Sequence, residues 1–253
     1  IAVETYGPDV ARDLPDETAV APTPQVVLVH GWMCTGRVWH EQIRRLADEA
    51  VLVTFDLPGH GRTPSPASGD YDLDLLADAL LAVIEQATEP GPVVLVGHSL
   101  GGMTVLHALE RHADVLAERV ADVVLLSATS RARPEELTFE LGIHAAAQLE
   151  QAINAAVDTV RGSKLVSASA RAYAATSDLT SLLVRAIAVG PGADPRVADF
   201  VEELRAASDP DMVLGLMAAV LGVDADEGLI ASQARFSIGV GTHDRLTPPS
   251  LSR

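Results

Sequence analysis

A glycine-x-serine-x-glycine sequence lies between an apolar run and a helical pattern, and it is the strongest constraint on the fold of this chain. Residues 93–96 read Val-Val-Leu-Val, and Gly97, Ser99 and Gly101 follow directly. Apolar residues then recur at helical spacing from Met103 onward. Glycines on both sides of a serine relieve crowding at a sharp strand-to-helix turn, where the hydroxyl lies exposed at the edge of a sheet. The pattern therefore predicts that Ser99 is a nucleophile on such a turn.

Short β-branched runs alternate with amphipathic stretches through the first half of the chain. The strand-like runs cover residues 26–29, 51–55, 93–96 and 123–126. The stretches with helical spacing cover residues 39–46, 73–83 and 103–109. Continuous apolar strands that alternate with helices are typical of a parallel sheet covered on both faces. We therefore expect an α/β fold.

The rhythm changes after residue 130 to an alanine-rich region. Apolar residues recur at helical spacing between residues 141 and 160. Two later helices are expected to start at Asp194-Pro195 and Asp209-Pro210, because aspartate caps a helix and proline fits its first turn. A strand-like run returns at residues 236–240. We therefore expect a helical cap, or lid, at residues 131–228, inserted into a core made of residues 1–130 and 229–253.

The chain is acidic and has a single cysteine. Its formal net charge of -17 disfavours binding to nucleic acid or to anionic lipid surfaces. Cys34 cannot form an internal disulfide, so we expect a cytoplasmic location. No run reaches the roughly 20 apolar residues that span a bilayer. No signal peptide pattern is seen near Ile1, although the chain begins without methionine and a removed leader stays open.

Three further motifs surround the serine motif in a fixed order. They are His30-Gly31-Trp32, Asp56-Leu57-Pro58-Gly59-His60-Gly61-Arg62-Thr63 and Gly241-Thr242-His243-Asp244-Arg245-Leu246-Thr247-Pro248, each after a strand-like run. With these four motifs the chain resembles the α/β-hydrolase fold superfamily, in particular its esterases and lipases. The resemblance covers nearly the whole chain outside the cap. It implies a mostly parallel central sheet flanked by helices, with an all-helical cap inserted after the sixth strand.

The resemblance also implies catalytic roles. Ser99, on the nucleophile elbow, would attack an acyl carbon, and the backbone N–H groups of Trp32 and Leu100 would form the oxyanion hole. Asp244 would be the acid that orients the base. Residues 127–130, where an alternative acid would stand, contain no carboxylate, which favours Asp244. The other interpretation of Asp244 is an ordinary turn residue ahead of Thr247.

Three residues are expected to line the substrate pocket. Met33 and Cys34 follow the oxyanion turn, and His98 occupies the variable position of the elbow, where its side chain should point away from the reacting centre. We expect Cys34 to be an inert apolar group. The histidines are scattered and the glycines form no nucleotide-binding fingerprint, so we expect neither a metal nor a cofactor.

The catalytic histidine is not evident in the sequence. In this fold the order is serine, acid, histidine, with the histidine on a loop after one more strand. His30, His60, His98 and His243 belong to the motifs above, and the others fall on helical stretches: His40, His107, His112 and His144. We therefore expect the base after Arg253. The first strand, within residues 1–6, also looks curtailed.

Together these features predict a serine hydrolase that acts on carboxylic esters through an acyl-enzyme. The apolar cap favours a small, mainly apolar ester, bound by a monomer or homodimer. A thioesterase, lactonase, carbon–carbon hydrolase or perhydrolase would use the same serine, so these reactions stay open. A non-catalytic ligand-binding member of the superfamily is the alternative from another class.

Overall fold

The computed structural model describes residues 1–8, 23–131, 192–244 and 247–249, and a six-stranded sheet lies at its centre. The strands are β1 (Val3–Tyr6), β2 (Gln25–Val29), β3 (Val51–Phe55), β4 (Val93–His98), β5 (Val120–Leu126) and β6 (Arg235–Gly239). They lie in the order β1-β3-β2-β4-β5-β6. Only β1, at one edge of this described sheet, is antiparallel to its neighbour. The mostly parallel sheet predicted from the apolar runs is confirmed.

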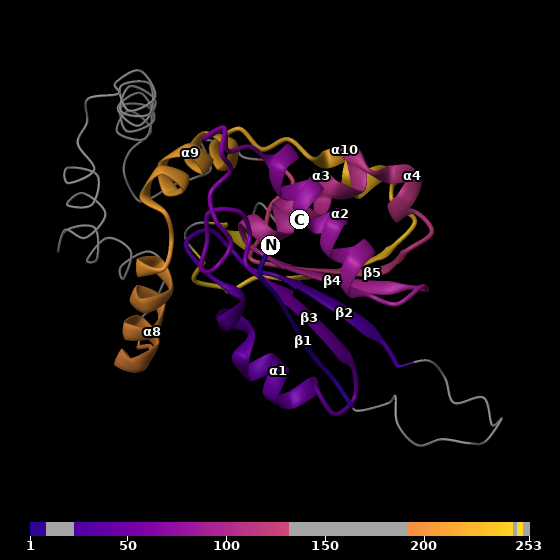
Figure 1. The fold of residues 1–253 in the computed structure, drawn as a ribbon, viewed down its shortest axis with the longest axis horizontal. Helices are drawn as coiled ribbons and strands as arrows, with labels where there is room; N and C mark the ends of the chain where they lie inside the picture. The colour runs from indigo at the N-terminus through magenta and orange to yellow at the C-terminus, as the bar shows by residue number, and fades with distance from the viewer. Residues whose placement is uncertain (9–22, 132–191, 245–246, 250–253) are drawn as a thin grey trace.

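Helices cover both faces of the sheet (Figure 1). On one face lie the 3-10 helix η1 (Gly36–Trp39) and α1 (His40–Leu46); on the other lie α2 (Leu73–Ala87), α3 (Leu100–Arg111), α4 (Ala113–Leu116) and α10 (Asp226–Ala231). Trp39 packs with Leu28 and Leu52 in the smaller apolar cluster, on the side of α1. The larger cluster fills the space between the sheet and α2 and α3. The central strands β2, β3, β4 and β5 are therefore covered on both faces, which explains their continuous apolar runs, whereas the edge strands β1 and β6 stay partly exposed.

The amphipathic pattern of α2 shows how the helices form. The carboxylate of Asp72 caps its first turn by accepting a hydrogen bond from the Leu75 amide at 2.8 Å. Leu76, Leu80 and Ile84 face the core and are fully buried.

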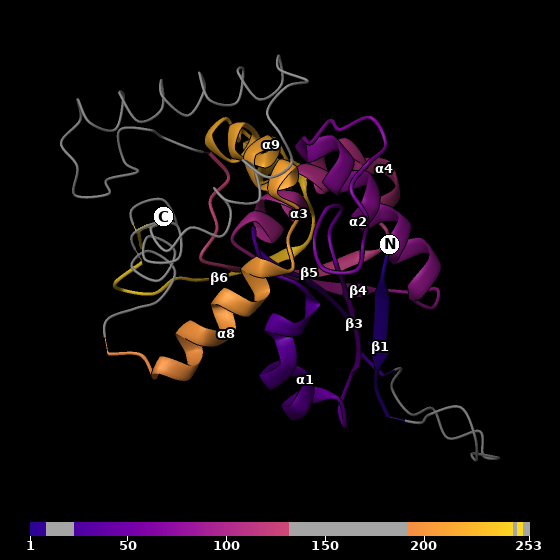
Figure 2. The same cartoon turned by 60° about the vertical axis from the view of Figure 1, so that its left-hand side comes forward.

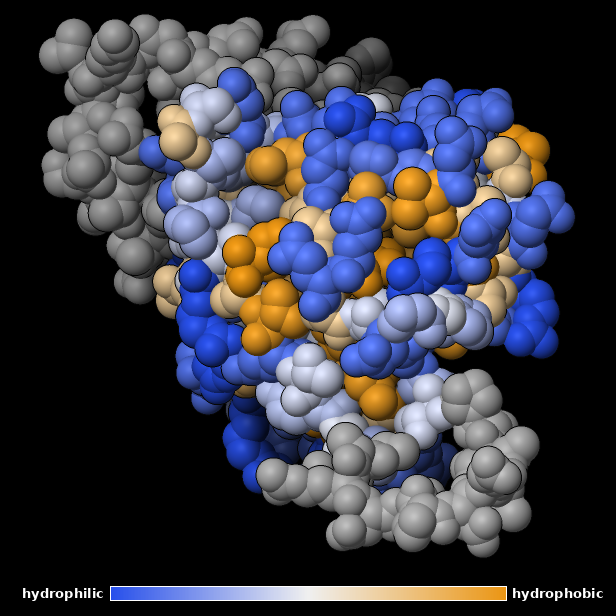
Figure 3. Space-filling model, turned by 45° about the vertical axis from the view of Figure 1, so that its right-hand side comes forward, coloured by the Kyte–Doolittle hydropathy of each residue, from blue (hydrophilic) through white to orange (hydrophobic). Residues whose placement is uncertain are grey.

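The face of the molecule drawn in Figure 3 mixes hydrophilic and hydrophobic residues in small groups. That mixture is normal for the surface of a globular protein.

The cap expected at residues 131–228 falls in the segment between β5 and β6. Residues 132–191, with the helix expected between residues 141 and 160, lie outside the described residues. The two later helices are present as α8 (Pro195–Ala206) and α9 (Pro210–Leu221). Their predicted starts are confirmed: Asp194 accepts a hydrogen bond from the Arg196 amide, and Asp209 accepts one from the Asp211 amide. Five described strands precede this segment, whereas the expectation placed the cap after the sixth.

The described end of the cap segment packs directly on the core. Met212 and Leu216 of α9 are completely buried and belong to the larger apolar cluster. A Cβ on Gly228 of α10 would lie 1.9 Å from the Leu106 carbonyl oxygen of α3, so the two helices are in close contact. Helix α8 lies beside α1 (Figure 2), and Glu203 pairs there with Arg37 at 2.7 Å. No described helix is long and apolar enough to cross a membrane.

Candidate active site

Ser99 occupies a strained turn between β4 and α3. Its φ of 52° and ψ of -120° are rare for any residue other than glycine. Its amide donates to the Leu126 carbonyl at 2.9 Å, and its own carbonyl accepts from the Gly102 amide at 2.9 Å. Ser99 is half-buried, and its hydroxyl makes no hydrogen bond with any described residue. The predicted strand-turn-helix arrangement is therefore present, with a free hydroxyl at the carboxyl end of β4.

The glycines of this turn are required by close packing. A Cβ on Gly97 would lie 2.6 Å from the Gly102 backbone, and one on Gly101 would lie 2.2 Å from the Val29 carbonyl oxygen. Real Cβ atoms do not approach other atoms so closely. The two glycines let α3 begin directly against the end of β2, which brings the residues after β2 next to Ser99.

Three described non-glycine residues have a positive φ, and all three follow neighbouring strands. They are Met33 (φ 56°) after β2, Ser99 after β4 and Ser127 (φ 48°) after β5. Such backbone conformations cost about 1–3 kcal/mol each and are concentrated at functional sites. Ser127 was not singled out from the sequence, because nothing in its local pattern demands a left-handed backbone. The carboxyl edge of the sheet is thus the strained part of the described molecule.

The two amides expected to bind an oxyanion belong to adjacent segments. Leu100 is the first residue of α3, where amides have no partner within the helix and the helix dipole favours negative charge. Trp32 lies in the turn closed by the hydrogen bond from the Cys34 amide to the Gly31 carbonyl, at 3.1 Å. Among the described residues, neither the Trp32 amide nor the Leu100 amide has a protein acceptor. Both N–H groups are therefore available to a ligand.

Asp244 lies beyond the carboxyl end of β6, at the edge of the sheet that also carries Ser99. The ends of the strands are tied together there, because Ser127 donates its amide to the Gly239 carbonyl at 2.8 Å. The Asp244 carboxylate accepts hydrogen bonds from the Thr247 amide at 2.9 Å and from the Thr247 hydroxyl at 3.1 Å. These contacts fix the orientation of the carboxylate.

The three expected pocket residues lie around the same edge. Burial lowers the pKa of His98, and the negative charge of Asp244 opposes this shift, so the two side chains are close in space. The His98 Nδ1 atom is buried without a described partner and would lie 2.8 Å from a Cβ on Gly31. Burial raises the pKa of the Cys34 thiol to about 11, which keeps it protonated and unreactive at neutral pH. Met33 is half-buried in the same turn.

No described histidine is hydrogen-bonded to Ser99. His107 pairs with Asp74 at 2.7 Å and His112 with Asp78 at 2.8 Å, and both aspartates belong to α2. His40 lies at the start of α1, and the exposed His243 contacts Thr242. His30 and His60 are completely buried, and His144 lies outside the described residues. Nor does the described part of the chain contain a group of three or more side chains that could hold a metal ion.

The buried His60 makes the stability of the fold depend on pH. Its ring lies against that of His30, with the ring centroids 4.9 Å apart, and burial lowers the pKa of His60 from 6.5 to about 4. The unfolded chain takes up this proton below about pH 6.5, whereas the folded chain takes it up only near pH 4. The free energy of unfolding should therefore fall by about 3 kcal/mol as the pH drops through this window. Urea unfolding of the wild type and of His60→Gln checks this, since the variant should lose that part of the pH slope; equal slopes would contradict it.

Comparisons with known proteins agree with this geometry. A family model described as alpha/beta hydrolase fold matches residues 24–215. A pimeloyl-[acyl-carrier protein] methyl ester esterase of Chromobacterium violaceum is 30% identical over 230 residues, which are 91% of this chain and 80% of that protein. The protein of the same name from Methylococcus capsulatus is 38% identical over 108 residues, which are 43% of this chain and only 38% of the relative. The structure of an esterase from Exiguobacterium antarcticum superposes with a TM-score of 0.70 at 19% identity, and covers 98% of this chain and 80% of its own.

Proposed function

The chain belongs to the alpha/beta hydrolase fold family, and from this premise we propose that it hydrolyses carboxylic esters through an acyl-enzyme formed on Ser99. The observation that carries the proposal is the turn at Ser99, whose strained backbone presents a free hydroxyl between the end of β4 and the start of α3. Ser127 has a similar φ of 48°, but only at Ser99 is the strained backbone combined with two flanking glycines, Gly97 and Gly101, that are packed against backbone atoms. The names of the curated relatives support the same chemistry.

The reaction follows from the groups around Ser99. A base removes the hydroxyl proton as the oxygen attacks the ester carbon, and the negative charge that develops on the carbonyl oxygen is bound by the amides of Trp32 and Leu100. The alcohol leaves with a proton, and water then releases the acid by the same steps in reverse order. Asp244 orients the base and stabilises its charged form. We propose that the base is a histidine outside the described residues, because no described histidine bonds to Ser99.

The substrate proposed is a small or medium ester with little charge. An acidic protein with a net charge of -17 disfavours anions, and no arginine cluster surrounds Ser99 in the described residues. A helical cap at residues 131–228 would roof the pocket lined by Met33, Cys34 and His98. A cytoplasmic location fits the single cysteine.

Two measurements test this function. A fluorophosphonate probe should label the wild type and Ser127→Ala but not Ser99→Ala, since Ser127 shares the strained backbone without lying on the elbow. A panel of methyl esters, thioesters and lactones then separates the related reactions; neutral esters should be cleaved faster than monoesters of dicarboxylic acids of equal length. A complete protein that neither reacts with the probe nor cleaves any ester would be a ligand-binding member of the family.

A further inference from the structure

The loop that carries the Trp32 amide is tied to the end of β3 at both of its ends. At its start, His30 Nε2 accepts a hydrogen bond from the Leu57 amide at 2.9 Å. Since that nitrogen accepts, the proton of the neutral ring is on Nδ1, which donates to the Gly31 carbonyl at 2.8 Å. Burial and the neighbouring His60 lower the pKa of His30 and so keep the ring in this neutral form. The first tie therefore fixes the backbone directly before Trp32.

The second tie is a buried carboxylate. Asp56, only 5% exposed, accepts a hydrogen bond from the Gly36 amide on Oδ1 at 2.8 Å and one from the Arg62 amide on Oδ2 at 2.9 Å. Gly36 ends the loop and Arg62 belongs to the segment after β3. Both oxygens of Asp56 are thus used to join these two segments. Hydrogen bonds from backbone amides to a charged carboxylate are about twice as strong as neutral ones.

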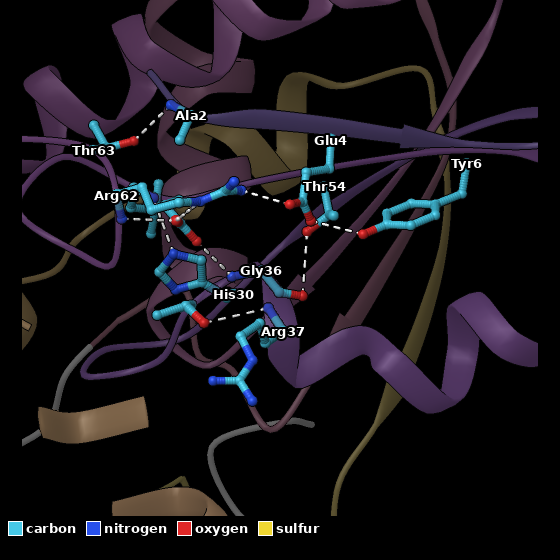
Figure 4. A network of polar contacts seen from close by, with 12 residues as sticks. Ala2, Glu4, Tyr6, His30, Gly36, Arg37, Thr54, Arg62 and Thr63 are labelled. Atoms are coloured by element: carbon cyan, nitrogen blue, oxygen red, sulfur yellow. Dashed lines mark hydrogen bonds and ion pairs between the residues drawn. The ribbon is translucent and has the colours of Figure 1, made fainter. Parts of the chain in front are cut away.

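The surroundings of Asp56 are built around this carboxylate. Gly61 has a φ of 52°, and a Cβ there would lie 2.4 Å from Asp56 Oδ2, so only glycine leaves room for the contact. The Arg62 side chain reaches over to Glu4 of β1 at 2.7 Å, and Glu4 also accepts from the Tyr6 hydroxyl at 2.7 Å (Figure 4). The glycine-rich motif at residues 56–63 therefore encloses the Asp56 carboxylate. It does not itself take part in the chemistry proposed at Ser99.

We infer that Asp56 is a positioning residue for ester hydrolysis, which sets the place of the Trp32 amide in the oxyanion hole; this inference rests on the proposed function. An oxyanion donor acts only when it lies at hydrogen-bond distance from where the charge develops. Met33, next to Trp32, has a strained φ of 56°, which persists only when the surrounding structure holds it. His30 and Asp56 provide that hold from the two ends of the loop.

Asp56→Asn tests the inference. A carboxamide oxygen can accept from one of the two amides, and its NH₂ group then faces the other N–H, so one tie is lost with almost no change in size. We expect kcat to fall about 10- to 100-fold, less than the loss of a whole oxyanion donor, with the KM of the ester within about twofold of wild type. The inhibition constant of an alkyl trifluoromethyl ketone, which forms an oxyanion on Ser99, should rise by the same factor as kcat falls. A purely structural role would lower the melting temperature and the active fraction without moving that constant.

Glu4→Gln is the matched control. It removes the exposed ion pair with Arg62 but leaves both amide hydrogen bonds of Asp56 in place. Exposed ion pairs contribute little, so kcat should stay within about twofold of wild type. An equal loss in Glu4→Gln and Asp56→Asn, or no loss of kcat in folded Asp56→Asn, would overturn the inference.

Amide hydrogen exchange separates this inference from the proposed function, because it needs no activity. In the wild type, the Gly36 amide should exchange as slowly as the amides of the neighbouring sheet, and in Asp56→Asn the peptide covering residues 31–36 should exchange faster. Rapid exchange of the Gly36 amide in the wild type would overturn the inference even if the variant does not fold. Slow exchange in a wild type that cleaves no ester would instead reject the proposed function and leave the tie intact.

Discussion

Ser99→Ala is expected to lower kcat for ester hydrolysis by about 10⁶, the scale on which a serine protease loses turnover without its nucleophile. The oxyanion amides and the pocket remain in this variant, so a residual rate above that of water should persist. The measurement is kcat at saturating ester, with the protein purified away from any host esterase. A loss of less than about 100-fold would place the nucleophile elsewhere.

The same position should show an inverse relation between activity and stability. The Ser99 hydroxyl has no described partner, so alanine should change the free energy of unfolding by less than about 0.5 kcal/mol. Glycine should raise it by about 1 kcal/mol, because relief of strain at a φ of 52° exceeds the added entropy of the unfolded chain. Urea unfolding of Ser99→Ala and Ser99→Gly measures both changes.

Ser127→Gly is the control for this inverse relation between activity and stability. It relieves a similar strain, at a φ of 48°, on the neighbouring strand and leaves the nucleophile in place. We expect a similar gain in stability with a far smaller loss of kcat. A marked destabilisation of Ser99→Gly would mean that the serine supports the fold, and the functional interpretation of its strain would fail.

The order of strands and helices along the chain could be predicted, because local sequence patterns determine which element each segment forms. The apolar run at residues 93–96 and the flanking glycines predicted the turn at Ser99, and the Asp-Pro pairs predicted where α8 and α9 begin. The antiparallel pairing of β1 with β3 was not predicted, since a run of four residues has no pattern that specifies its partner. The packing of Met212 in the larger apolar cluster could not be predicted from local patterns either, because it depends on where α9 lies relative to the sheet.

At the candidate site, the residues proposed to touch substrate could be identified from motifs, whereas the residues that hold them in place could not. Asp56 and Gly36 are 20 positions apart, and their hydrogen bond exists only because β2 and β3 are neighbours in the sheet. In the sequence, only the glycine at position 61 hinted at this close contact with Asp56, and the sequence alone did not show what the glycine makes room for. The proximity of His98 to Asp244 likewise depends on the order of β4, β5 and β6.

Asp244→Asn is expected to lower kcat by about 10⁴, the cost of the corresponding change in serine proteases. The asparagine oxygen can still accept from the Thr247 amide, so the loop should keep its shape. On the proposed mechanism, the change removes the negative charge that would stabilise the protonated base and select its tautomer. The fall should therefore appear in kcat at every ester of the panel, with an unchanged melting temperature.

Two control variants test whether the loss of kcat comes from removing the carboxylate of Asp244 in particular. Thr247→Val removes the hydroxyl donor to Asp244 but keeps the charge, so kcat should fall by less than about tenfold. Asp122→Asn removes a carboxylate that pairs with Arg235 at 2.8 Å, near the amino ends of β5 and β6 and thus at the opposite edge of the sheet from Ser99. That variant should keep full activity, because its charge lies far from the reacting atoms. Near-normal turnover in Asp244→Asn would reduce Asp244 to a turn residue held by Thr247, and the acid would then have to come from outside the described residues.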